Sequence, residues 1–253
     1  MSFFPLVFAL SVPFWVAGAV TGLELLPGLP LAATMAFCPA VAAGILLYRD
    51  QGTEAVVRLL ERSVDFRRTR RRVWYLPTLL LMPSVMLASY DLMRWMRVPL
   101  PVPEIRLRIV PPMLLAFMVA ALAEELGWSG YATDRMQPRW GELRSGLQLG
   151  VLWAAWHLVP LIEVHRRPGW IAGWSVGTIA NRVIIVRLYN ATDRSVFAAA
   201  LYHAMANLTW QLFPNAGSHY DPRVSAPLLA LAAALMVASA EPARVRRRCE
   251  TAT

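Results

Sequence analysis

Long apolar runs, separated by short polar stretches, follow one another along most of the chain. Each run has roughly 15–23 residues, close to the roughly 20 that an α-helix needs to cross a bilayer. None shows the alternation of apolar and polar residues that marks membrane β-barrel strands. The pattern therefore predicts an all-α fold, a polytopic α-helical membrane bundle of about eight transmembrane helices. The expected spans are residues 3–23, 30–48, 74–93, 109–131, 145–162, 171–188, 196–213 and 224–240.

The composition agrees with this pattern. Of the 253 residues, 57% are hydrophobic and only 16% are charged, a balance too apolar for a water-soluble globular domain. Once the spans are set aside, the remaining residues suffice only for loops and the two ends of the chain. We therefore expect residues 1–253 to form a single transmembrane domain, with the lipid bilayer as its main partner.

The positive charge is carried entirely by arginine, with 25 Arg, no Lys and a net charge of +9. Because the arginines flank the apolar runs, they indicate contact with lipid headgroups and no nucleic-acid partner. An even number of spans puts both termini on one side, which holds 17 arginines against 7 on the other. The positive-inside rule makes the richer side cytoplasmic. The lack of lysine and the arginine and alanine bias indicate the inner membrane of a bacterium.

The only long polar stretch covers residues 49–73. Aliphatic residues alternate there with Arg58, Glu61 and Asp65 in a partly amphipathic helical pattern, and a run of arginines closes the segment. Such a pattern is typical of a basic helix that lies along the cytoplasmic headgroups. A solvated linker with the same charges fits the pattern about as well.

Polar residues within the apolar runs are the candidates for function. An ionisable group at membrane depth costs about 2.5–3.5 kcal/mol on insertion scales, so it normally faces a cavity or a partner. The fourth predicted span carries the adjacent pair Glu124 and Glu125. Neighbours on a helix point about 100° apart, so one carboxylate can enter a pocket while the other meets a neighbouring helix. The fifth and seventh spans each carry two residues four positions apart, on one helix face: Trp153 and His157, and His203 and Asn207.

Each of these groups also has a structural explanation of its own. A buried glutamate can pair with Arg182 or Arg135, an asparagine can hydrogen-bond between helices, and a histidine among tryptophans can be interfacial. A catalytic site accounts for all of them together, whereas the structural explanations must treat each one separately. We therefore favour the catalytic interpretation.

The chemistry that fits these residue types is hydrolysis inside a bilayer cavity. A carboxylate in an apolar pocket with a second carboxylate nearby suits a general base that activates water. An imidazole can position that water, and a His and an Asn one turn apart can present two donors to an oxyanion. Glu, His and His are also plausible zinc ligands. The residue types alone do not separate the two schemes.

These segments resemble the CAAX protease and bacteriocin-processing (CPBP) family, also described as type II CAAX prenyl endopeptidase-like or ABI proteins and as intramembrane metalloproteases. Its signatures on successive core helices are Glu-Glu-x-x-x-Arg, Phe-x-x-x-His and His-x-x-x-Asn. The corresponding segments here are residues 124–129, 153–157 and 203–207. The resemblance covers roughly residues 109–212, which it implies to be the catalytic core.

The resemblance implies an intramembrane endopeptidase that hydrolyses a peptide bond near the cytoplasmic membrane surface. Its substrate would be a peptide or a membrane protein. Glu124 would activate water together with His157, and Glu125 would be the supporting carboxylate. His203 and Asn207 would stabilise the oxyanion. A divalent metal such as zinc, held by Glu124, His157 and His203, is a weaker implication.

The sequence departs from the first signature at Ser129, which stands where the family has arginine. If that arginine holds the second glutamate, its loss leaves Glu125 short of a partner. Arg135, six positions on, can substitute from the next helical turns. Trp153 in place of phenylalanine in the second signature keeps a bulky aromatic residue.

Three other functions stay open beside the peptidase. A catalytically impaired membrane scaffold or immunity protein is motivated by Ser129. A proton-coupled transporter could use the two glutamates as a relay. Ser129 also lies in a Gly-x-Ser-Gly sequence like that around the rhomboid nucleophile, a short pattern that recurs by chance.

Overall fold

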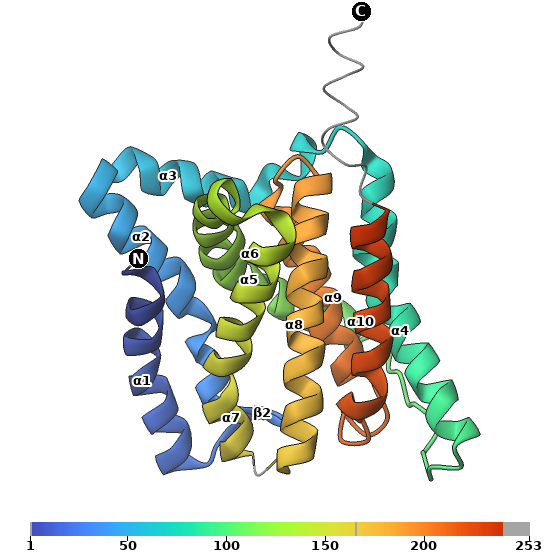
Figure 1. Ribbon diagram of the computed structural model, residues 1–253. Coiled ribbons are helices and arrows are strands. Elements are labelled where there is room, and N and C mark those ends of the chain that lie inside the picture. The colour runs from blue at the N-terminus through green and yellow to red at the C-terminus, as the bar shows by residue number, and fades with distance from the viewer. Residues whose placement is uncertain (1, 165, 240–253) are drawn as a thin grey trace, which may run out of the picture.

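The computed structural model describes residues 2–164 and 166–239. The chain forms a bundle of helices, most of which run alongside one another (Figure 1). This confirms the predicted all-α fold. The helices are α1 (Phe3–Thr21), α2 (Cys38–Gln51), α3 (Thr53–Glu61), α4 (Tyr75–Trp95), α5 (Val110–Gly127), α6 (Asp134–Trp156), α7 (Leu158–Glu163), α8 (Pro168–Ala191), α9 (Val196–Gln211) and α10 (Pro222–Ala238).

Every predicted span overlaps a helical segment, but the expected spans 196–213 and 224–240 contain helices of only 16 and 17 residues. Five helical stretches of the described chain are long and apolar enough to cross a membrane. Their outer faces carry large exposed apolar side chains, such as Val16 and Val20 on α1 and Leu87 on α4. Such faces suit a lipid environment, where helices satisfy all backbone hydrogen bonds internally. The protein is therefore an integral membrane protein. The five stretches are Phe3–Thr21, Leu31–Gln51, Arg72–Trp95, Val110–Trp156 and Pro168–Ala191.

Two local expectations need correction. Residues 132–144, expected as a loop, are helical, because a π-helix (Trp128–Thr133) joins α5 directly to α6. Within α6 the backbone leaves the helical conformation at Gly141, where φ is +72°. Glycine adopts such a positive φ without strain because it has no Cβ. Between α1 and α2 the chain also forms a small antiparallel hairpin of β1 (Glu24–Leu26) and β2 (Leu29–Pro30), followed by a 3-10 helix (Leu31–Phe37).

The polar stretch 49–73 is largely helical. It contains α3, a 3-10 helix (Arg62–Arg68) and a short 3-10 turn (Arg72–Trp74). Figure 1 shows α3 lying across one end of the bundle. Ala55 and Leu59 are buried on the inner face of α3. The arginines at the end of the polar stretch, at positions 67, 68 and 70–72, are exposed. Of the two interpretations of this stretch, the helical one therefore agrees with the structure better than an irregular linker does. The last residue of the expected span 224–240, and the basic tail after it, lie outside the described residues.

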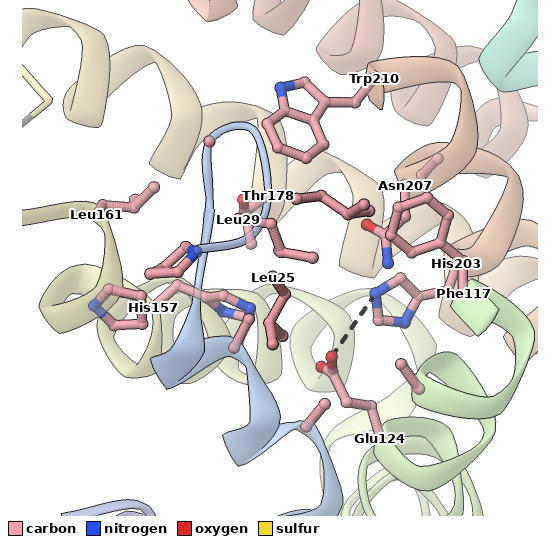
Figure 2. A pocket seen from close by; sticks show the side chains of 18 of the residues that line it. Leu25, Leu29, Phe117, Glu124, His157, Leu161, Thr178, His203, Asn207 and Trp210 are labelled. Carbon is pink, nitrogen blue, oxygen red and sulfur yellow. Dashed lines mark ion pairs between the residues drawn. The ribbon is translucent and has the colours of Figure 1, made fainter. Parts of the chain in front are cut away.

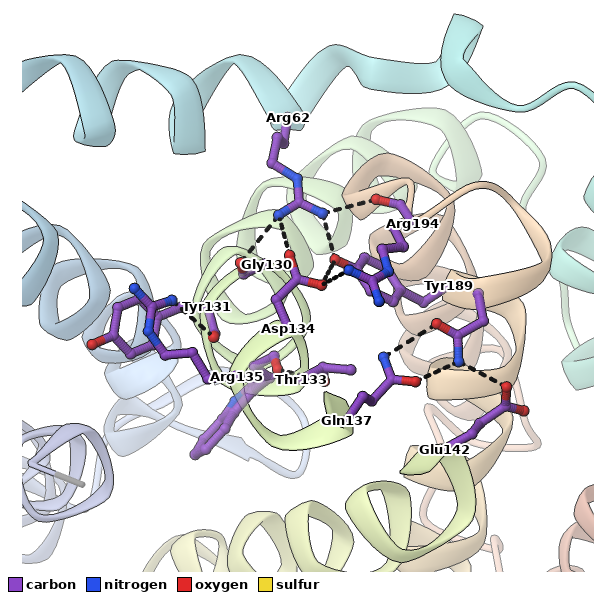
Figure 3. A network of polar contacts seen from close by, with 12 residues as sticks. Arg62, Gly130, Tyr131, Thr133, Asp134, Arg135, Gln137, Glu142, Tyr189 and Arg194 are labelled. Carbon is purple, nitrogen blue, oxygen red and sulfur yellow. Dashed lines mark hydrogen bonds and ion pairs between the residues drawn. The ribbon is translucent and has the colours of Figure 1, made fainter. Parts of the chain in front are cut away.

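Arg62 fastens this segment to the bundle (Figure 3). Its guanidinium donates to Oδ2 of Asp134 at 2.9 Å, to the carbonyl of Gly130 at 3.1 Å and to the carbonyl of Arg194 at 2.9 Å. It also donates to the hydroxyl of Tyr189, which in turn donates to Oδ1 of Asp134 at 2.7 Å. One side chain therefore connects the surface segment with the helix after the glutamate pair and with the loop before α9.

The core is organised around α5 and α9, which pack against each other. Helix α5 also packs against α2, α9 against α4, and α8 lies between α6 and α10. The contact of α5 with α2 depends on Gly127, because a Cβ there would lie 2.5 Å from the backbone of Pro39. This close approach positions the end of α5 that carries the two glutamates.

An aromatic cluster ties α1 to the same region. Trp128 is fully buried, and its ring makes edge contacts with Phe3 at 5.7 Å and with Trp156 at 5.6 Å between centroids. The indole Nε1 of Trp156 donates to Oγ of Ser11 at 2.7 Å. Because Trp156 precedes His157, α1 helps to fix the second signature segment.

Candidate active site

The four polar residues proposed from the sequence line one cavity of about 640 Å³. Glu124 comes from α5, His157 from the junction of α6 and α7, and His203 and Asn207 from α9. The rest of the lining is mainly apolar and aromatic, and includes leucines of the β1–β2 hairpin (Figure 2). The predicted convergence from three parts of the chain on one hollow is present. Other lining residues are Leu25, Leu29, Phe117, Leu161, Thr178 and Trp210.

The two glutamates face different partners, as their 100° separation on the helix predicts. Glu124 lines the cavity, whereas Glu125 is fully buried behind it and does not. The pair therefore splits into one carboxylate that a substrate can reach and one that organises its neighbours.

Glu124 is held by the aromatic residue of the second signature. Nε1 of Trp153 donates to Oε2 of Glu124 at 2.8 Å. The other oxygen, Oε1, lies 3.9 Å from Nε2 of His203 (Figure 2), which is longer than a hydrogen bond. One oxygen of Glu124 is thus fixed, and the other faces His203 across a gap within the cavity wall.

Glu125 has three donors around it. Nη1 of Arg182, on α8, donates to Oε2 at 2.8 Å, and both side chains are fully buried. The hydroxyl of Ser129 donates to the same oxygen, and Nδ1 of His203 lies 3.1 Å from Oε1. A carboxylate paired with arginine only accepts hydrogen bonds, so Nδ1 of His203 carries the hydrogen of that contact. Glu125 is therefore not stranded.

His157 lies farther along the cavity. Its Nδ1 is 2.9 Å from the carbonyl oxygen of Trp153, one turn earlier, and therefore carries the hydrogen of that bond. Its ring packs against Trp156 and Trp174 at 4.8 and 5.1 Å between centroids. The structure gives it no hydrogen bond to Glu124 among the described residues. The expected partnership of these two residues is thus limited to a shared cavity.

Two supporting residues differ from the sequence expectation. Arg135 is not in the site, because its guanidinium lies 3.6 Å from the ring of Tyr131 and donates to the Tyr131 carbonyl. Arg182 takes the role that the sequence suggested for Arg135. Ser129 is buried, bonded to Glu125 and absent from the cavity lining, so its position does not suit a nucleophile.

Two features of the site were not predictable from the sequence. The indole hydrogen bond to Glu124 depends on how α6 is rotated toward α5, and the π-helix after the glutamates follows from packing. Single π-turns in helices are frequent at functional sites. Arg182 was one of the two arginines considered from the sequence as a glutamate partner, because of its charge at membrane depth, and in the structure it pairs with Glu125.

The candidate metal ligands do not converge as a set of three. No group of three or more His, Cys, Asp or Glu side chains that could hold a metal ion occurs in residues 2–164 and 166–239. Nδ1 of His203 is engaged by Glu125 and Nδ1 of His157 by a backbone carbonyl, which leaves Nε2 as the nitrogen of each ring that could bind a metal. Zinc sites in enzymes normally offer three protein ligands, and no such set occurs among the described residues, so the chemistry proposed for this site uses no metal.

Comparison with known proteins gives the same relationship as the signatures. Residues 106–209 match the family model described as type II CAAX prenyl endopeptidase Rce1-like. This part of the chain is similar to the Rce1-like CAAX proteases. The matched range contains Glu124, His157, His203 and Asn207.

One relative shows how far the similarity reaches. The chain is 29% identical over 110 residues to a CAAX prenyl protease 2 of Methanococcus maripaludis, a stretch that covers 40% of this chain and 40% of the relative. The match thus spans less than half of the length of that protein. The family model covers residues 106–209.

Proposed function

We propose that this protein is an intramembrane endopeptidase that hydrolyses a peptide bond near the cytoplasmic membrane surface. The observation that carries the proposal is the convergence of Glu124, His157, His203 and Asn207 on one largely apolar cavity. The similarity of residues 106–209 to type II CAAX prenyl endopeptidases supports it. The glutamates lie at the end of α5 that leads directly into the turn fastened by Arg62, which is why we place the reaction near the arginine-rich surface.

Glu124 is the proposed general base. Its Oε1 and Nε2 of His203 face each other across 3.9 Å, a separation at which a water molecule can contact both atoms. As the water oxygen attacks the carbonyl carbon, Glu124 takes the water proton. When the C–N bond breaks, the same proton passes to the amine nitrogen that leaves. The hydrogen bond from Trp153 keeps the carboxylate oriented through both steps.

His203 and Asn207 are the proposed oxyanion donors. They lie four residues apart on α9 and line the same wall of the cavity. Because Nδ1–H of His203 points to Glu125, Nε2 is the atom that faces the reacting groups. When Nε2 is protonated, it can donate to the carbonyl oxygen that gains negative charge, together with the Asn207 amide. Glu125 stabilises the imidazolium from the other side.

His157 is proposed to orient the substrate or the water from the second end of the cavity. Its Nδ1–H is committed to the Trp153 carbonyl, which leaves Nε2 as an acceptor. Removal of this residue should therefore lower the rate less than removal of Glu124. The difference separates an orienting role from that of the base.

The cavity favours substrates with an apolar segment next to the scissile bond. Its wall is built from aliphatic and aromatic side chains, and the carboxylate lies at one point of it. The relative named CAAX prenyl protease 2 makes a prenylated cysteine peptide a reasonable probe. A membrane-protein or secreted-peptide substrate fits the same lining.

The test uses the full-length protein in lipid nanodiscs and a library of internally quenched peptides, half of which carry an S-farnesyl cysteine. Cleavage sites are read by mass spectrometry. Glu124→Gln should lower kcat/KM by about 10²–10⁴-fold, and Asn207→Ala by about 10²–10³-fold. Glu61→Gln and His219→Ala replace residues outside the cavity and should cleave like wild type.

Cleavage that persists in Glu124→Ala, His157→Ala and His203→Ala would contradict the proposal. So would a complete lack of cleavage across the library by folded wild-type protein. The second outcome favours a silent scaffold, although the feature that motivated that alternative is weakened. The serine at position 129 does not leave Glu125 without a cationic partner, because Glu125 is paired with Arg182 and also accepts from Ser129.

A further inference from the structure

Arg182 and Glu125 form a fully buried ion pair in the centre of the bundle. The guanidinium and the carboxylate are 2.8 Å apart, and neither side chain is exposed. Such a pair is costly to bury, and loss of one partner leaves an uncompensated charge in the interior. Arg182 does not line the cavity, so its importance lies in what it holds and not in contact with a substrate.

Both departures from the family signatures meet at this arginine. Ser129 donates to Oε2 of Glu125, the oxygen that also accepts from Arg182. The ring of Trp153 lies under the guanidinium, 4.1 Å from its Cζ. Arginine over an indole ring is the strongest common cation–π arrangement in proteins. The serine, the tryptophan and the arginine therefore belong to one group of contacts.

We propose that Arg182 is the positioning cation of this site, supplied from α8 in place of the arginine that the first signature has at position 129. The geometry gives the two positions a common target. Ser129 lies one helical turn after Glu125 and already reaches its Oε2, so an arginine at 129 would approach the same oxygen. A small residue at 129 leaves that oxygen to Arg182.

Arg182 acts on both walls of the site. Through Glu125 it fixes Nδ1 of His203 and thus the direction of Nε2. Through the ring that it covers, it orients Trp153, whose Nε1 holds Glu124. One buried cation therefore sets the geometry of the base and of an oxyanion donor, and this role deepens the proposed peptidase function and rests on it.

The test moves the charge from α8 to position 129. Arg182→Gln removes the cation, Arg182→Lys keeps the charge without the planar group, and Ser129→Arg with Arg182→Gln restores an arginine at the signature position. Arg187→Gln is the matched control, since Arg187 lies five residues further on α8 and faces Glu142 at 3.8 Å. Activity is measured in nanodiscs on the best-cleaved peptide of the library described above.

We expect Arg182→Gln to lower kcat at least tenfold with little change in KM, because substrate contacts stay in place. Arg182→Lys should recover part of the rate, and the relocated arginine should recover at least fivefold over Arg182→Gln. Ser129→Arg alone should not raise kcat above that of wild type. The Arg187→Gln control should have the same kcat as wild type. A folded Arg182→Gln protein with wild-type kcat, or a double variant no better than Arg182→Gln, would overturn the proposal.

Thermal unfolding gives a readout that does not depend on activity. Arg182→Gln should lower Tm on the order of 10 °C by leaving Glu125 buried without a cation. Combining Glu125→Gln with Arg182→Gln should raise Tm part of the way back to that of wild type, since it removes the unpaired charge. Combining Ser129→Arg with Arg182→Gln should also raise Tm, since it supplies a new cation. If wild type cleaves nothing but this pattern holds, the peptidase proposal fails while the pairing stands. If Tm is unchanged in Arg182→Gln, the pairing itself is refuted.

Discussion

The indole nitrogen of Trp153 donates a 2.8 Å hydrogen bond to Oε2 of Glu124. The aromatic residue of one signature segment therefore holds the carboxylate of another, across the interface of two helices. Phenylalanine, which the family signature has at this position, has no hydrogen to donate. The substitution is thus more than a conservative exchange of bulky rings.

The first prediction concerns this bond. Trp153→Phe restores the signature residue but leaves one oxygen of Glu124 without its donor, so we expect kcat to fall by about tenfold or more, equivalent to roughly 1.4 kcal/mol. Peptide cleavage in nanodiscs measures the change. Trp15→Phe is a control for loss of an indole donor, because Nε1 of Trp15 donates to Sδ of Met35 and Trp15 does not line the cavity. Higher activity in Trp153→Phe than in wild type would contradict this role.

Asp65 provides a second prediction, about the start of α9. Its carboxylate accepts from the backbone N–H of Val196 at 3.2 Å and of Phe197 at 3.1 Å, and from the hydroxyl of Ser195. Free N–H groups at a helix N-terminus need such acceptors. Asp65→Ala should lower the free energy of unfolding by about 1–2 kcal/mol.

Detergent-based unfolding, followed by circular dichroism, measures this change. Asp65→Asn keeps one acceptor oxygen and should lose less than Asp65→Ala. Equal losses in the two variants would show that the acceptor contacts contribute little and that the negative charge alone matters.

The third prediction tests how Arg62 fastens the surface segment (Figure 3). Arg62→Gln should lower the free energy of unfolding by about 2 kcal/mol, because hydrogen bonds from a charged donor are lost. Asp134 then keeps its more distant contact with Arg194, at 3.6 Å. Arg58→Gln, on the exposed face of α3, should cost at most about 0.5 kcal/mol, since its pair with Glu54 is open to solvent. Limited proteolysis between residues 52 and 72 should become faster in Arg62→Gln alone. Equal proteolysis in both variants would argue against a fastening role.

The fourth prediction concerns the contact of α5 with α2. Gly127→Ala should destabilise the protein by about 1–3 kcal/mol, since the new Cβ would lie 2.5 Å from the Pro39 backbone and force the helices apart. Because Glu125 lies only two residues before Gly127, activity should fall as well. Gly44→Ala is the control: nothing lies within 4 Å of its Cβ position on α2, so the variant should be neutral or slightly more stable. A Gly127→Ala protein as stable as wild type would show that the two helices can separate freely.

The spans were predictable because a bilayer imposes its demand on composition, residue by residue. A helix must be apolar over roughly 20 residues to cross it, and that property can be read without knowing any contact. The candidate residues were predictable for the same reason, since a charge such as that of Glu124 at membrane depth stands out against its neighbours. Spacing of four residues likewise placed His203 and Asn207 on one face of α9.

Which partner each polar group meets was decided only by the tertiary structure. The sequence showed that Glu124 and Glu125 diverge, but the rotation of α5 against α8 and α9 determines that Glu125 meets Arg182 and His203. The expected helper Arg135 turned instead to Tyr131, because its helix leaves the site after the π-turn. Contacts between helices far apart in sequence depend on how whole surfaces pack, and no local pattern encodes that. The chain itself thus determined the membrane fold and the participants, and packing determined the pairs.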